Sequence, residues 1–182
     1  MSAMMRGRKG KQMGIMDSLR STKKPAAGTP VLPETEFRAR LMALNRGTAP
    51  FQLVAGSSQG VDLVAEWKIV DAQWHEVFAK AGISKVFRIL MRFDAERHEV
   101  RAVDQELSVE WSAGVPRIAV AAAKFQGQMQ TLEFGRAVAF TEQRGPGEVY
   151  PYHFDTRELK APVQDVVTAS GWTYKGVAFG KL

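Results

Sequence analysis

The sequence contains no cysteine, which excludes disulfides, thiolate nucleophiles and cysteine metal sites and fits a reducing compartment. Long apolar runs are also missing. The longest purely aliphatic stretch covers residues 118–123, far short of the roughly 18 residues of a transmembrane helix. The N-terminus lacks the apolar core, about 7–15 residues long, of a signal peptide. These absences predict a soluble, cytoplasmic protein without a transmembrane segment.

Motifs for nucleotide binding and catalysis are scarce as well. We find no Walker sequence and no Gly-x-Gly-x-x-Gly after a predicted strand. Ser57 and Ser58 lie in a predicted loop and not in a nucleophile elbow. The histidines, His75, His98 and His153, have no second histidine or cysteine at metal-ligand spacing. We therefore expect no metal site and no cofactor.

Positive charge is concentrated at the N-terminus. Residues 1–28 hold seven basic residues and one acidic residue, Asp17, for a net charge of +6. The remaining chain holds 18 basic and 18 acidic residues, so its net charge is zero. We predict that the N-terminal cations bind an acidic partner. They are Arg6, Arg8, Lys9, Lys11, Arg20, Lys23 and Lys24.

The charge of this region depends on where translation starts. Candidate starts are Met1, Met4, Met5, Met13 and Met16. A product beginning at Met13 would keep three of the seven cations together with Asp17, for a net charge of +2. Every inference from the N-terminal charge would then be weaker.

Composition divides the chain into two parts. Residues 1–32 are dominated by Gly, Pro, Ser, Thr, Lys and Arg, and contain too few apolar residues to offset the entropy of ordering. The rest has the length of one domain and can bury roughly 68–70% of its unfolded surface. We predict a flexible basic tail and linker over residues 1–32 and a single α+β domain over residues 33–182.

Periodicity predicts three helices and about nine strands. Helices are expected over residues 34–45, over 71–82 with Asp71 as N-cap and Gly82 as left-handed stop, and from Asp155 or Thr156 to Gly171. Pro162 must lie in a first turn or at a kink. Strands are expected over residues 51–54, 61–70, 85–93, 98–104, 107–111, 117–125, 129–140, 149–154 and 172–179, with a bulge at Gly135.

The short links between these strands predict antiparallel neighbours, because a parallel pair needs a long crossover. So many consecutive strands would expose unpaired edges unless the sheet curls. We therefore expect an α+β fold with a predominantly antiparallel, strongly curved sheet or partial barrel. Two or three helices pack against it.

His153 and Asp155 are the candidate catalytic pair. Two positions apart, they can project from one face of a strand end, where the carboxylate can orient the imidazole as a general base. Asp155 has a competing role as a helix cap, so the pair also has a purely structural interpretation.

Arg88 and Arg92 are the candidate anion-binding pair of the domain. They lie on one face of the strand predicted over residues 85–93. The structural alternative is a polar ladder with Glu99 or Arg101 across the hairpin.

Three functions follow from these patterns. The leading hypothesis is a non-enzymatic binding or adaptor domain whose basic tail contacts an acidic partner, either nucleic acid or an anionic membrane surface. The alternative is a small hydrolase or ligand-binding half-barrel with a site near His153 and Asp155. The third is a purely structural subunit that oligomerises with a protein partner through an exposed sheet edge or an apolar patch.

Overall fold

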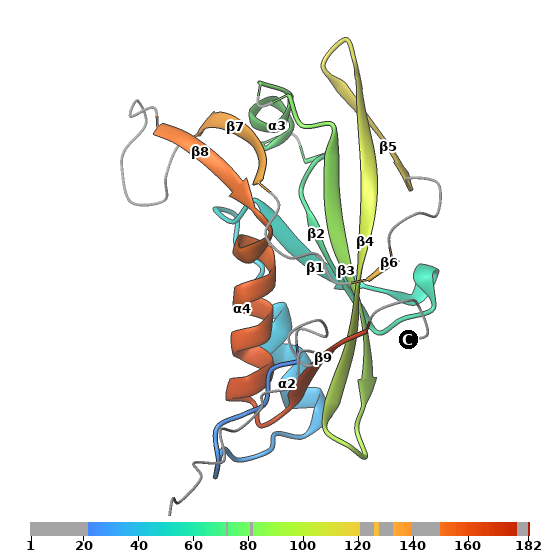
Figure 1. Cartoon of the computed structure of the whole chain (residues 1–182), viewed down its shortest axis with the longest axis vertical. Helices are drawn as coiled ribbons and strands as arrows, with labels where there is room; N and C mark the ends of the chain where they lie inside the picture. The colour runs from blue at the N-terminus through green and yellow to red at the C-terminus, as the bar shows by residue number, and fades with distance from the viewer. Residues whose placement is uncertain are drawn as a thin grey trace, which may run out of the picture.

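A long hairpin of two strands forms the centre of the fold (Figure 1). β3 (Lys85–Asp94) and β4 (Glu99–Ser112) pair antiparallel over ten register positions, from Lys85 opposite Ser108 to Asp94 opposite Glu99. The computed structural model describes residues 22–71, 73–80, 82–120, 126–127, 133–139, 150–177 and 182. The other elements are arranged around this hairpin.

The two edges of the hairpin are extended differently. β3 pairs with β2 (Leu63–Trp67), which pairs with the edge strand β1 (Phe51–Ala55). β4 is long enough to pair with three short strands in succession. These are β9 (Thr173–Gly176), β6 (Gln126–Gly127) and β5 (Val115–Val120). A separate two-stranded sheet contains β7 (Glu133–Ala139) and β8 (Tyr150–Asp155).

Two helices cover one face of the large sheet. α2 (Glu34–Met42) and α4 (Thr156–Ala169) lie beside each other along this face, which we call the inner face (Figure 1). A third helix, α3 (His75–Lys80), lies near β7 and β5.

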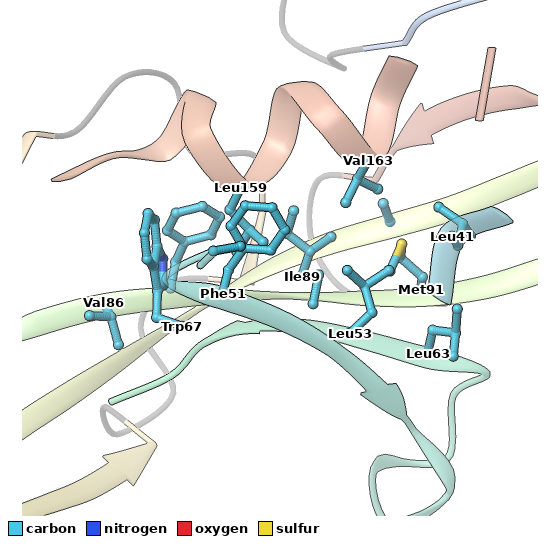
Figure 2. Packing of buried hydrophobic residues seen from close by; sticks show 14 of the residues in the cluster. Leu41, Phe51, Leu53, Leu63, Trp67, Val86, Ile89, Met91, Leu159 and Val163 are labelled. Atoms are coloured by element: carbon cyan, nitrogen blue, oxygen red, sulfur yellow. The ribbon is translucent and has the colours of Figure 1, made fainter. Parts of the chain in front are cut away.

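The core lies between α4 and the inner face. Leu159, Val163 and Val167 recur at one-turn spacing on α4 and are fully buried. Figure 2 shows Leu159 and Val163 above apolar side chains of the sheet, including Phe51 and Ile89. Burial of each aliphatic side chain stabilises the fold by about 1.5–3 kcal/mol.

The α+β class is confirmed, and the sheet is mixed and open. β9 runs parallel to β4, whereas the other described pairings are antiparallel. Within the described residues no pairing joins β1 to β5, so the sheet does not close. Residues 113–172 supply the long connection that a parallel β4–β9 pair needs, including α4. None of the described helices is long and apolar enough to cross a membrane.

Several predicted elements have different bounds. The strands predicted over residues 98–104 and 107–111 form one strand, β4, which begins at Glu99. β2 is shorter than the expected 61–70. α3 starts later than expected, at His75, because the Trp74 N–H donates to the Asp71 carbonyl (3.0 Å) in a separate turn before it. The Asp71 carboxylate accepts the Gln73 N–H (2.9 Å), which is the bond expected of a capping aspartate. Pro162 lies in the interior of α4, not in its first turn.

Two local predictions are confirmed. The β7–β8 register shifts between Phe134 and Arg136, which gives the expected bulge at Gly135. At the end of α3, Gly82 has φ +63° and the Ile83 N–H donates to the Phe78 carbonyl, the bond that defines a Schellman ending.

Candidate functional site

The end of the expected N-terminal linker is attached to the domain. Lys23 and Tyr174 exchange two backbone hydrogen bonds of 2.8 and 2.9 Å, so Lys23 extends the free edge of β9 by one antiparallel bridge. Leu32 donates its N–H to the Ser170 carbonyl (3.1 Å) and accepts the indole N–H of Trp172 (2.9 Å). Residues 22–32 therefore lie against α4 and β9, where composition alone predicts a flexible linker.

Gly171 allows this attachment. It ends α4 with φ +76°, and the Trp172 N–H donates to the Val167 carbonyl in a second Schellman ending. A Cβ atom at Gly171 would lie 2.5 Å from the Pro30 carbonyl oxygen, closer than real Cβ contacts. Only glycine therefore allows the N-terminal segment to pass so close to the end of the helix.

The predicted tail cations divide into two groups. Lys23 and Lys24 are exposed at the edge of β9. The other five lie outside the described residues: Arg6, Arg8, Lys9, Lys11 and Arg20. The described part of the cationic segment therefore begins beside β9.

Arg88 and Arg92 both have partners within the chain. The half-buried Arg88 donates from Nε to the side-chain oxygen of Gln105 (2.7 Å), its register partner on β4. The exposed Arg92 donates to the main-chain oxygens of Gly60 and Leu182, the latter at 2.8 Å. A polar ladder therefore exists at Arg88, through Gln105. Arg92 lies opposite Arg101, as expected, but its hydrogen bonds go to main-chain oxygens.

The candidate catalytic pair lies on β8, next to the start of α4. His153 is opposite Arg136, and Asp155 is opposite Glu133. The side chains of this strand lie outside what the structure describes, so the His153–Asp155 hypothesis stays a prediction. His98 lies in the β3–β4 turn with φ +48°, and its ring contacts Trp172 edge-on at 5.7 Å between centroids.

A buried ion pair joins α4 to β4, which the sequence reasoning did not identify. Lys160 Nζ lies 2.6 Å from Asp104 Oδ2, with side-chain exposures of 9% and 0%. One signal was present in the sequence: alternation places Asp104 on the same face of the strand as Val100 and Ala102. In the structure this face is the inner one, with Asp104 opposite Ile89. The other signal was a polar stripe on α4, formed by Thr156, Lys160 and Gln164 at one-turn spacing.

Tyr174 completes this buried polar cluster. Its side chain is fully buried, and its hydroxyl has no hydrogen-bond partner among the described residues. Burial, with a smaller contribution from the Asp104 charge, raises the pKa of the phenol well above its ordinary value. The hydroxyl therefore stays protonated and shielded from solvent, which suits a structural role better than proton transfer with a substrate.

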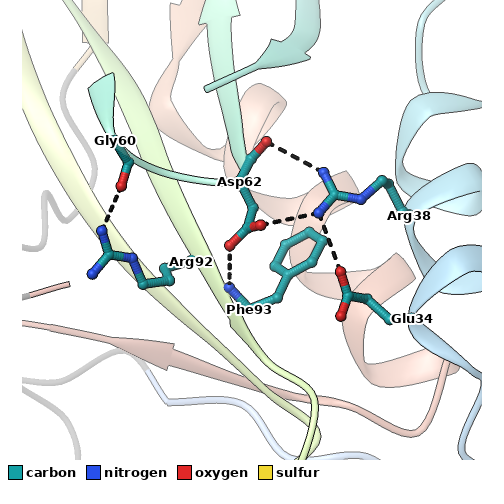
Figure 3. A network of polar contacts seen from close by, with 6 residues as sticks. All are labelled: Glu34, Arg38, Gly60, Asp62, Arg92 and Phe93. Carbon is teal, nitrogen blue, oxygen red and sulfur yellow. Dashed lines mark hydrogen bonds and ion pairs between the residues drawn. The ribbon is translucent and has the colours of Figure 1, made fainter. Parts of the chain in front are cut away.

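A second polar network fastens α2 to the sheet (Figure 3). The Arg38 guanidinium donates to Asp62 Oδ1 (3.0 Å) and Glu34 Oε1 (3.2 Å), and lies 4.8 Å from the centroid of the Phe93 ring. Asp62 Oδ2 accepts the Phe93 N–H (2.9 Å). Because each polar group here has an internal partner, the network is explained by its structural role.

Residues 56–60 read Gly-Ser-Ser-Gln-Gly, which fits the letters Gly-x-Ser-x-Gly, but they do not form a nucleophile elbow. Residues Ser57–Gln59 form a 3₁₀ turn, and Ser58 lacks the left-handed backbone that in the described chain occurs only at His98, Ala113 and five glycines. The Ser58 hydroxyl donates to the neighbouring Gln59 side chain (2.7 Å) on the exposed surface. The prediction of a loop at this position is therefore supported.

The described residues thus contain two polar networks that join helices to the sheet, and the end of the cationic segment, which is bound to β9 through Lys23. In this part of the chain, no group of three or more His, Asp and Glu side chains is placed to hold a metal ion. Comparison with known proteins finds no protein-family model, no curated protein and no solved structure that matches this chain.

Proposed function

We propose that this protein is a non-enzymatic binding domain whose basic N-terminal segment contacts a polyanionic partner. One observation carries the proposal: the whole net charge of +6 lies within residues 1–28, while the rest of the chain is neutral. A cationic segment of this kind neutralises phosphate groups and releases their counterions, which gives affinity without a folded pocket.

The attachment of residues 22–32 supports this proposal. Lys23 is bound to β9, and Leu32 is bound to the end of α4 and to Trp172. The five cations therefore precede, by 3 to 17 positions in the sequence, a point at which the chain is bound to the domain. Fixing one end of a charged segment lowers the entropy that is lost when it binds.

The test replaces the five cations Arg6, Arg8, Lys9, Lys11 and Arg20 with glutamine in the full chain. Binding to labelled single-stranded DNA, to RNA and to anionic phospholipid vesicles is then measured at low salt. We expect the unmodified chain to bind at least one of these polyanions, and the substituted chain to lose most of that affinity. Equal binding by both chains, or no binding by either, would reject the proposal.

A matched control removes the same amount of charge from the domain surface. Arg40, Lys80, Lys85, Arg97 and Arg117 are all exposed, and glutamine at these five positions lowers the net charge equally. If binding depends on the N-terminal segment and not on net charge alone, this control keeps most of its affinity.

A further inference from the structure

Three basic residues form a row across neighbouring strands of the large sheet. Arg92 on β3 is the register partner of Arg101 on β4, which is the register partner of Lys175 on β9. Directly opposed side chains project from the same face, and strands lie about 4.8 Å apart, so the row is roughly 10 Å wide. Figure 3 shows Arg92 and Phe93 on opposite sides of β3, with Phe93 toward α2. The row therefore lies on the outer face, away from α2 and α4.

The need for a stable sheet does not explain this row. Like charges that are directly opposite each other on neighbouring strands destabilise the pairing, and the row contains two such pairs in succession. The middle cation is flanked by a positive charge on each side. Such an arrangement becomes favourable when an external anion lies across it.

The partners of the three cations point to the same conclusion. Lys175 Nζ lies 3.2 Å from both carboxylate oxygens of Glu99, and Arg92 donates to main-chain oxygens. Arg101 is half-buried and forms no hydrogen bond or ion pair with any residue that the structure describes. The middle cation is therefore the only one of the three without a hydrogen-bond or ion-pair partner among the described residues.

We infer that the Arg92–Arg101–Lys175 row binds phosphate groups of a nucleic-acid backbone. This inference rests on the proposed function and extends its surface, because Lys23 pairs with Tyr174, the residue before Lys175. Lys23 lies opposite Tyr174, so its side chain projects toward the inner face, but its backbone lies at the edge of the row. A nucleic acid bound by the residues before Lys23 can therefore pass over this edge onto the outer face. Arginine suits this role, since its planar guanidinium donates two parallel hydrogen bonds to one phosphate.

The surroundings of the row favour a nucleic acid over a membrane. Membrane-surface binding combines cations with apolar side chains that enter the bilayer. The apolar neighbours on the outer face, Val64, Leu90 and Val103, are buried. The exposed large apolar side chains of the described residues all lie off β3, β4 and β9: Val31, Met42, Val70, Val115 and Ile118.

The experiment measures binding of the full chain to a fluorescein-labelled single-stranded oligonucleotide by fluorescence anisotropy over a series of salt concentrations. We expect Arg101→Gln to weaken binding several-fold at low salt and to lower the salt slope by about 0.7, the value for one phosphate contact on a single strand. Glu99→Gln should strengthen binding, because it releases Lys175 from its ion pair. Arg117→Gln is the matched control, since it removes the same charge from an exposed position on β5 outside the row.

The results separate this inference from the proposed function. If Arg101→Gln and Glu99→Gln both behave like Arg117→Gln while the five N-terminal substitutions abolish binding, the inference is wrong and the proposed function stands. If the row substitutions change binding and the N-terminal substitutions do not, the proposed function is wrong. Binding to anionic vesicles without binding to the oligonucleotide would overturn the assignment of the row to nucleic acid.

Discussion

At the scale of single residues, the pair formed by Asp104 and Lys160 makes the sharpest prediction. A buried charge that loses its partner costs roughly 3–5 kcal/mol, because its desolvation is no longer offset. Lys160→Met should therefore lower the free energy of unfolding by about that amount, as measured by urea denaturation at neutral pH. The double variant Asp104→Asn with Lys160→Met should recover much of the loss, since no uncompensated charge remains. If the double variant is as unstable as the single one, the pair does not act as a unit.

Tyr174 predicts how stability depends on alkaline pH. Its folded-state pKa lies above the unfolded value of 10.0, so the unfolded chain releases the phenolic proton first. This contribution to stability is complete below pH 10 and is lost progressively as the pH rises from there toward the folded pKa. Tyr174→Phe removes this alkaline loss of stability and leaves no unpartnered hydroxyl.

The test compares unfolding of the two chains at neutral pH and above pH 10, with tyrosinate absorbance as a second readout. We expect Tyr174→Phe to be as stable as the natural chain or more stable at neutral pH. It should also lose less stability at alkaline pH. A phenylalanine variant with an unchanged alkaline decline would show that Tyr174 titrates normally.

At the scale of elements, the end of α4 is the critical junction. Gly171→Ala places a Cβ at φ +76° and 2.5 Å from the Pro30 carbonyl oxygen. The backbone strain alone costs about 1–3 kcal/mol, and the clash adds to it by pushing residues 22–32 away. We expect a lower midpoint of thermal unfolding and faster amide hydrogen exchange at Lys23 and Leu32.

Gly114 provides the control for this substitution. It has nearly the same backbone conformation, φ +79°, but a Cβ there would have no neighbour within 4 Å. Gly114→Ala should therefore show the strain without the faster exchange in residues 22–32. Equal exchange in the two variants would mean that the close approach at Gly171 does not hold the N-terminal segment.

The row of cations makes an opposite prediction for stability. Each like-charge pair across strands costs roughly 0.2–1 kcal/mol, and Arg101 belongs to both pairs of the row. Arg101→Gln should therefore raise the free energy of unfolding by roughly 0.4–2 kcal/mol at low salt. The gain should shrink as salt is added, because screening weakens the repulsion. A clear loss of stability would show that Arg101 supports the fold and has an unrecognised partner.

Local signals in the sequence were sufficient for part of this fold. Alternation predicted β3 within one residue of its end, and Gly82 with Ile83 predicted the Schellman ending. The parallel pairing of β9 with β4 could not be predicted from the sequence, because no local pattern indicates which edge of a sheet a strand will join. β4 was divided in two because it keeps Asp104 and Glu106 on its inward face, where apolar residues were expected.

At the scale of the whole molecule, the sequence indicated that basic residues form the candidate binding surface, but it did not indicate which basic residues lie side by side. Arg88 and Arg92 were selected from one strand, yet the row pairs Arg92 with residues about 10 and 80 positions away. Only the β3–β4–β9 register brings Arg101 and Lys175 beside it. In the same way, low apolar content suggested a linker up to residue 32, whereas backbone hydrogen bonds hold residues 22–32 on the domain.

Polyanion binding by the N-terminal segment is the hypothesis on which the proposed function rests. The salt dependence of binding tests this hypothesis directly. For a single-stranded nucleic acid, the logarithm of the binding constant falls with the logarithm of salt concentration by about 0.7 per phosphate neutralised. We predict a steep slope for the full chain, and a slope shallower by about 3.5 units when Arg6, Arg8, Lys9, Lys11 and Arg20 are replaced with glutamine. The same slope in both chains would contradict the account.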